Sequence, residues 1–422
     1  MINMFGRFSD SFKSKEKTDF WRVAVESFEN KNYFDSFRNF VKYADDDETN
    51  NIKLTDNGSS LDIEFYQGTK LIKVKIDDEK VNAESDIAIV TKSGVAFMRR
   101  LLELNYGLYY SRFSLKDGMI VLKFDSSIID CSPSKFYYAI KEIALKADKQ
   151  DDLLTKDFNM LQPVIEVDTI VIPENEKKIE YKFYKKWIEE TIKTVNPLNE
   201  KSYEGGISYL LLSLVYKIDF FLLPEGNIVN ELEKLSSNYF TDDGKTFIEK
   251  NNSLKDGLQK LNDEPENKVI ESFYKTISAF SVLNPTNFSP ILNVIKDNQK
   301  NIKYYIDNKN EKIALAIYEY IFGYCLYNYG MVKCVSHFFK LAMVLINYEY
   351  YLEITGSSGN KYFIDENKLD EKLIKDEIND EIKNSGTEYP ELSFNTANLN
   401  FSSLLNFLHS FLKEIQNLNF NI

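Results

Sequence analysis

The first third of the chain begins with helical periodicity and then changes to alternation. Apolar residues recur at helical spacing over residues 17–44, and the polar residues 30–32 divide this stretch into two helices. From residue 52 to residue 76, apolar and charged side chains alternate, with Asn57-Gly58 and Gln67-Gly68 at the turn positions. This pattern predicts three antiparallel strands with one buried face. Residues 85–91 are a candidate for a short fourth strand.

A helix, a hairpin and a second helix follow. The predicted elements are a helix over 95–104, strands over 108–114 and 119–125, and a helix that begins at Ser132-Pro133. The tripeptide KDG at residues 116–118 joins the two strands as a tight turn. In the first helix we expect Met98, Leu101 and Leu102 to be buried. The order helix–β–β–β–helix–β–β–helix fits an α+β domain with an open antiparallel sheet and helices on one face.

From residue 178 onward the pattern is helical. The candidate helices are 178–194, 203–222, 226–237, 245–261, 266–283, 287–305, 310–328, 331–352, 366–384 and 400–416, with proline- and glycine-containing breakers between them. A chain of 422 residues is too long for one ordinary core. We therefore predict an α+β domain over residues 1–150, a linker over 151–177 and an all-helical domain over 178–422. We expect the first domain to fold by itself.

The net charge of the chain argues against two kinds of binding partner, nucleic acids and membrane surfaces. The formal charge is −13 and the pI is near 5.0, whereas nucleic-acid binding and electrostatic membrane anchoring both need clustered basic residues, so neither is expected. The N-terminus lacks the apolar core of a signal peptide. The longest apolar stretch, residues 209–223, is broken by Lys217 and Asp219, and we predict that it does not span a bilayer. Three cysteines, an odd number, fit a reducing compartment, so a cytoplasmic protein is expected.

No motif for catalysis stands out. The two histidines, His337 and His409, lack further ligands at metal-site spacing, and the pair of Cys334 and His337 is best explained as packing on one helix face. No Gly-x-Ser-x-Gly nucleophile motif and no phosphate-binding glycine loop occurs. We expect no catalytic residue, no metal site and no cofactor, and hence a protein that is not an enzyme. The alternative is an enzyme or small-ligand-binding protein with its site in the helical domain.

The stretch RRLLELNYGLYYSRFSLKDGMIVLKFD, residues 99–125, resembles a known family. A leucine-rich helix, an asparagine and a hairpin of the form R-F-S-L-x-x-G-x-h-x-L are found at Leu101, Leu102, Leu104, Asn105, Arg112, Phe113, Ser114, Leu115, Gly118 and Leu122. This text is similar to that of type III secretion chaperones of the Tir-chaperone class and of YbjN-like bacterial domains. The resemblance covers about residues 17–150. It implies binding of a partner protein along the sheet or helix faces, often from a homodimer, and no catalysis.

One helical hairpin, residues 316–349, resembles a tetratricopeptide repeat. The small and aromatic packing positions of the repeat correspond to Gly323, Gly330, Phe339 and Ala342. The concave groove of that family binds extended peptides, which implies a partner-binding site at Tyr320, Tyr324, Tyr327 and Asn328. The other interpretation is that the tyrosines pack against neighbouring helices.

The sequence as a whole predicts a non-catalytic interaction protein. It would bind a protein or peptide partner by addition of a strand to the sheet edge or in a helical groove. From the resemblance, a homodimer through the α+β domain is also expected.

Overall fold

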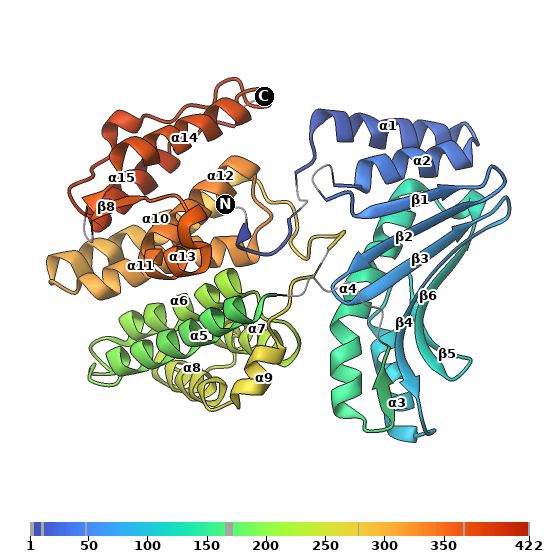
Figure 1. Ribbon diagram of the computed structural model, residues 1–422, viewed down its shortest axis with the longest axis horizontal. Coiled ribbons are helices and arrows are strands. Elements are labelled where there is room, and N and C mark those ends of the chain that lie inside the picture. The colour runs from blue at the N-terminus through green and yellow to red at the C-terminus, as the bar shows by residue number, and fades with distance from the viewer. Residues whose placement is uncertain are drawn as a thin grey trace. The chain divides into compact units, whose positions relative to one another are not determined.

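The computed structural model describes residues 4–9, 12–46, 49–164, 172–276, 278–365 and 368–420. The chain divides into two compact units. The α+β unit consists of Phe8–Val171 and Lys275–Val282, and the helical unit consists of Met1–Arg7, Ile172–Tyr274 and Leu283–Ile422. Figure 1 shows the sheet with its helices in one unit and a bundle of helices in the other. The predicted fold class, an α+β region followed by an all-helical one, is confirmed.

The α+β unit is built on an antiparallel sheet with the strand order β1-β2-β3-β4-β6-β5. The strands are β1 (Ile52–Asp56), β2 (Leu61–Gln67), β3 (Lys70–Ile76), β4 (Lys80–Val90), β5 (Arg112–Lys116) and β6 (Met119–Ser127), and β7 (Leu161–Pro163) pairs with β4 outside this order. Along β2 and β3, Ile63 lies opposite Val74 and Phe65 opposite Ile72, and all four are buried. Alternation therefore places one face of the sheet in the core.

Four strands, β1 to β4, precede the helix at Val95–Tyr106, whereas the predicted order had three strands before this helix. The strand β4 extends the candidate 85–91 toward the N-terminus as far as Lys80. The turn before it has no glycine. Instead, the Asp77 carboxylate accepts hydrogen bonds from the backbone N–H groups of Glu79 and Lys80, at 2.9 Å and 2.7 Å. An aspartate can close a turn in this way without a glycine. A prediction based on glycine-containing turns therefore does not detect the turn before β4.

Helices cover the core face of the sheet. They are α1 (Lys15–Glu29), α2 (Tyr33–Ala44), α3 (Val95–Tyr106) and α4 (Pro133–Asp157). The helix α4 runs along β3, β4 and β6 (Figure 1) and buries Phe136, Ile140 and Ile143. The Phe136 ring packs edge-on against Phe37 and Phe40 of α2, at centroid distances of 5.0 Å and 4.8 Å. These contacts join the N-terminal helices to the sheet.

The predicted linker, residues 151–177, contains ordered parts of the α+β unit. The helix α4 ends at Asp157, and its last turns bury Leu154. The Asp151 carboxylate lies 3.3 Å from the Nζ of Lys70, and both side chains are almost completely buried. The strand β7 then joins the sheet. Residues 165–171 lie outside the described residues.

The helical unit is arranged around α6. Its helices are α5 (Glu174–Val195), α6 (Glu204–Leu222), α7 (Gly226–Phe240), α8 (Phe247–Asn262), α9 (Glu266–Glu271), α10 (Phe288–Asp307), α11 (Glu311–Asn328), α12 (Lys333–Ile346), α13 (Tyr348–Thr355), α14 (Glu371–Ser385) and α15 (Leu404–Ile415), with a small hairpin of β8 (Phe363–Asp365) and β9 (Lys368–Leu369). The helix α6 contacts α5, α7, α8 and α11. Among the described residues, α6 is the helix that has the length and apolar composition of a membrane span, and 83% of that stretch is buried inside the structure.

The predicted helix over 203–222 is confirmed as α6, and both charged residues of its apolar stretch lie within it. Lys217 lies 3.4 Å from the carboxylate of Glu319 on α11, and Asp219 lies 2.8 Å from the guanidinium of Arg7. Because each charge has a partner of opposite sign, both residues can stay within a buried helix.

The predicted helix over 266–283 is wrong, since α9 ends at Glu271 and residues 275–282 belong to the α+β unit. The predicted helix over 331–352 is two helices, α12 and α13. They separate at Asn347, whose buried amide donates hydrogen bonds to the Glu319 carboxylate at 2.8 Å and to the Met343 carbonyl at 3.1 Å.

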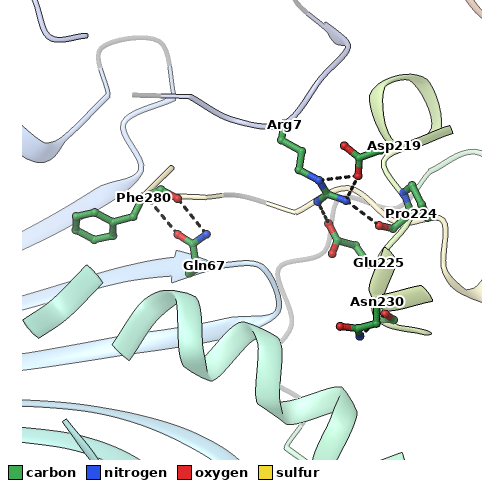
Figure 2. Close-up of polar contacts among 8 residues, drawn as sticks. Arg7, Gln67, Asp219, Pro224, Glu225, Asn230 and Phe280 are labelled. Atoms are coloured by element: carbon green, nitrogen blue, oxygen red, sulfur yellow. Dashed lines mark hydrogen bonds and ion pairs between the residues drawn. The ribbon is translucent and has the colours of Figure 1, made fainter. Parts of the chain in front are cut away.

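Residues 275–282 are held in the α+β unit by Gln67 (Figure 2). The Gln67 side chain accepts hydrogen bonds from the backbone N–H groups of Ala279 and Phe280, at 3.1 Å and 3.0 Å, and donates one to the Phe280 carbonyl at 3.2 Å. The Phe280 ring is buried against Phe65 and Tyr137. Since residues 1–7 belong to the helical unit, each unit contains a short segment from the other half of the chain.

Candidate functional site

The predicted tyrosine row lies on α11 and faces α6. The rings of Tyr320, Tyr324 and Tyr327 stand 6.1 Å, 5.8 Å and 5.1 Å from the ring of Tyr216, measured between centroids. Tyr216 is buried, and its hydroxyl hydrogen-bonds that of Ser236 at 2.9 Å. The row therefore packs α11 against α6, and a partner could reach only the part of these half-buried rings that stays exposed.

Gly323 lies within this row and makes the close packing possible. A Cβ atom at this position would lie 2.8 Å from the Cβ of Tyr216, which is closer than two carbon atoms can approach. The resemblance of residues 316–349 to a tetratricopeptide repeat predicts that Gly323 is a small packing position within that hairpin. In the structure its closest neighbour is Tyr216 of the earlier helix α6.

The hydroxyl groups of the row stay protonated near neutral pH. Burial raises the pKa of Tyr324 to about 12 and holds the pKa values of Tyr320 and Tyr327 above the usual range for tyrosine. Asn328 is exposed, and its side-chain amide donates to the Tyr324 carbonyl at 2.9 Å, at the C-terminal end of the helix. The row thus offers neutral hydroxyls and aromatic edges rather than charge.

The two histidines have polar partners that the spacing of residues along the chain did not predict. The Nε2 of His337 lies 3.3 Å from a Glu377 oxygen, and its Nδ1 lies 3.9 Å from Glu381. Both carboxylates come from α14, far away in sequence, so spacing around the histidine could not show them. His409 hydrogen-bonds the Tyr318 hydroxyl at 3.2 Å. Within the described ranges, no three histidine, cysteine or acidic residues form a group that could hold a metal ion.

An exposed apolar stripe runs along α3. Val95, Met98, Leu102 and Tyr106 stand at positions i, i+3, i+7 and i+11, and they expose 77%, 37%, 70% and 96% of their surface. In the loop that follows, Tyr109 is also exposed. We call these five residues the α3 face.

The prediction that Met98 and Leu102 are buried is wrong. The core side of α3 is formed by Phe97 and Leu101 instead. The helix carries two apolar stripes, and periodicity alone cannot show which of them turns inward. The burial of Leu101 was predicted correctly.

Asn105 ties the end of α3 to the edge strand of the sheet. Its side-chain oxygen accepts a hydrogen bond from the backbone N–H of Phe113 at 2.6 Å, and its amide nitrogen donates to the Phe113 carbonyl at 3.0 Å. Phe113 is in β5, the last strand in the sheet order. The asparagine thus occupies the backbone groups that an added strand would use at this position. Asn105 lies in the stretch of residues 99–125 that resembles the chaperone family, but its hydrogen bonds to Phe113 could not be deduced from the sequence.

Glu142 of α4 holds the loop after α3. Its carboxylate accepts hydrogen bonds from the backbone N–H groups of Tyr109, Tyr110 and Ser111, at 2.8 Å, 3.0 Å and 2.8 Å, and from the Ser111 hydroxyl at 2.7 Å. Burial acts to raise the pKa of Glu142, but these hydrogen bonds outweigh it and the pKa lies below its usual value. The loop that carries exposed Tyr109 is therefore fixed by a charged group.

No family model and no curated protein matches this chain.

Proposed function

We propose that this chain is a non-catalytic protein-binding module, chaperone-like in its α+β unit, and that the α3 face is where a partner protein docks. The observation that carries the proposal is the exposed apolar stripe on a helix whose other side lies in the core. Contiguous exposed apolar surface on a folded unit marks an interaction site. A cytoplasmic location is part of the proposal, and the three free, buried cysteines support it.

The α3 face is held in place before any partner arrives. Asn105 fixes the end of the helix to β5, and Glu142 fixes the loop that carries Tyr109. A surface that is already ordered loses little conformational entropy on binding, so more of the contact energy appears as affinity.

Of the two binding routes that the sequence left open, the helix face has the stronger support in this unit. Addition of a strand to β5 requires free outward-facing backbone groups. At Phe113 these groups are bound by Asn105. A partner would have to displace that amide before it could extend the sheet.

Charged residues around the face indicate the chemistry of the partner. Lys92, Arg99 and Arg100 are exposed beside the apolar stripe, and Glu103 lies 3.5 Å from Arg100. An amphipathic helix with an apolar stripe and acidic neighbours would match this surface. A second copy of α3 presents the same apolar stripe and one acidic residue, Glu103, which can pair with a basic residue of the first copy. We therefore propose a homodimer through the α3 face, in line with the family resemblance.

The test replaces Leu102 by glutamate. Because Leu102 is 70% exposed, the variant should fold, while a charge in the centre of the face should prevent docking. The matched control is Ile364→Glu, an apolar position of the helical unit that is 63% exposed. Sedimentation velocity should show a dimer for the wild type and the control, and a monomer for Leu102→Glu. A wild type that stays monomeric, or a variant that dimerises like the wild type, would contradict the proposal.

The tyrosine row remains a second proposed contact, in the helical unit. Removal of whole rings would disturb the packing on Tyr216, so the informative variant replaces Tyr324 and Tyr327 by phenylalanine and Asn328 by alanine. Chemical cross-linking of the purified protein with any partner that depends on Leu102 can be repeated with this triple variant. Unchanged cross-linking would remove the row from the binding surface.

A further inference from the structure

Residues 4–7 are bound by the helical unit as a short bent segment, with Gly6 in the left-handed conformation. Phe5 is 2% exposed. Its ring packs against four aromatic rings at centroid distances of 5.1–6.2 Å, those of Phe220, Phe221, Tyr350 and Tyr351. An aromatic residue surrounded by aromatic residues is a typical anchor of peptide recognition.

Gly6 fits its position for two reasons. Its backbone N–H donates to the Phe220 carbonyl at 2.9 Å, near the end of α6. Its φ angle is +81°, and a Cβ atom would lie 3.1 Å from the Phe220 ring. A residue with a side chain would be strained in this conformation, so the position selects glycine.

Arg7 provides the third contact. Its guanidinium donates two hydrogen bonds to one oxygen of Asp219, at 3.0 Å and 2.8 Å, and one each to the Glu225 carboxylate at 3.4 Å and the Pro224 carbonyl at 3.2 Å. Figure 2 shows the guanidinium between these groups. Burial alone would lower the pKa of Arg7, but the two carboxylates outweigh it and hold the pKa above its usual range.

The binding surface requires a cation. The Asp219 side chain is only 6% exposed, and among the described residues its ion-pair partner is Arg7, so without Arg7 its charge would lie close to the apolar core. An unpaired buried carboxylate is costly, and a point cation could not make the branched contacts of the guanidinium. Arg7 itself is 29% exposed and Met4 is 41% exposed, so the bound segment lies at the surface of the unit.

We propose that this surface is a peptide-binding site for a short aromatic–glycine–arginine segment that bends at the glycine, which residues 5–7 occupy in cis and which a partner peptide of the same chemistry occupies in trans. The contacts come from one ring, one backbone N–H and one guanidinium, as in short-motif recognition. The cis segment has the advantage of high effective concentration, so it acts as a competitor that a trans peptide must displace. This proposal concerns the helical unit and is independent of the α3 face.

The experiment measures binding of a fluorescent peptide with the sequence of residues 1–9 by fluorescence anisotropy. The protein is the full chain without residues 2–7, compared with the intact chain. Saturable binding to the truncated protein is expected, at least tenfold tighter than to the intact chain, whose own segment competes. Peptides with Phe5→Ala or Arg7→Glu, and the truncated protein with Asp219→Asn, should each bind at least tenfold more weakly. The matched control is Asp243→Asn, an acidic residue that is not in contact with the segment.

Several results would overturn the proposal. One is a truncated protein that still melts cooperatively but does not bind the peptide. Another is equal binding of the Phe5→Ala peptide. If the truncated protein does not fold, the intact chain with Phe5→Ala and Arg7→Ala replaces it in the same measurement. If that variant also fails to fold, the segment is part of the core of the helical unit and the surface is not a site for exchangeable peptides.

Discussion

Glu142 is a helix residue whose carboxylate binds backbone N–H groups of a surface loop. Replacing it by glutamine keeps the shape of the side chain but removes the charge that serves four donors. We expect Glu142→Gln to lower the free energy of unfolding by about 1–3 kcal/mol, the range for charged hydrogen bonds that are left incomplete. The matched control is Glu26→Gln, since Glu26 is exposed and pairs with Arg22 of the same helix at 2.9 Å. Chemical denaturation of the two variants and the wild type measures the difference.

The pH dependence of this effect has a definite sign. The pKa of Glu142 lies below its usual value of 4.5, so the folded state binds the proton less readily than the unfolded chain does. The stabilisation is then fully present above the usual pKa and is lost as the pH falls through the lower, folded-state pKa. Unfolding curves of the wild type and Glu142→Gln should therefore converge on acidification below pH 4.5. A constant difference down to low pH would show that the charge does not hold the loop.

The tertiary contacts of individual polar and small residues could not be predicted from the sequence. Asn105 and Gly323 were both noted as parts of motifs, but their contacts, with Phe113 and Tyr216, come from other elements. The same is true of His337, whose carboxylate neighbours are on α14. Spacing along the chain can find partners on one helix, whereas these partners are brought together by tertiary packing.

The helix α3 shows how an element can be predicted correctly and oriented wrongly. Its existence follows from periodicity, and the structure places it at Val95–Tyr106. Two hydrogen bonds between Asn105 and Phe113 are consistent with the observed rotation of the helix about its axis. Phe97 and Leu101 then point to the core, and Met98 and Leu102 remain outside.

The two hydrogen bonds between Asn105 of α3 and Phe113 of β5 lead to a prediction for the edge of the sheet. We expect Asn105→Ala to lower the free energy of unfolding by about 1–3 kcal/mol, because two backbone groups of Phe113 lose their partner. Amide exchange at Phe113, followed by NMR, should become faster. The control is Asn308→Ala, an exposed asparagine that donates to the Tyr304 carbonyl of the helical unit. Unchanged exchange at Phe113 would mean that the edge is protected by something other than Asn105, and the argument against strand addition would fail.

The exchange of segments between the two halves of the chain is the property that the sequence predicted least well. Residues 275–282 were assigned to a helix because their apolar positions suit helical spacing. The described residues of this segment are not helical, and Gln67, Phe65 and Tyr137 of the α+β unit bind Ala279 and Phe280. Local periodicity carries no information about such a distant partner. A fragment of residues 1–150 would therefore lack Phe280 and the last turns of α4, which belong to the core of its unit.

Phe280 tests this dependence in the intact chain. It is buried against Phe65 and Tyr137, so Phe280→Ala should remove a core side chain and lower the free energy of unfolding by about 3–5 kcal/mol. The control is Val282→Ala in the same segment, where the side chain is exposed and little change is expected. Hydrogen exchange should then accelerate in β2 and β3, which are distant from Phe280 in sequence. If exchange accelerates only in the helices α9 and α10, which flank the segment along the chain, the segment is not part of the α+β core. Faster exchange in β2 and β3 with helices α9 and α10 unchanged would show that the α+β unit depends on a segment from the other half of the chain for its stability.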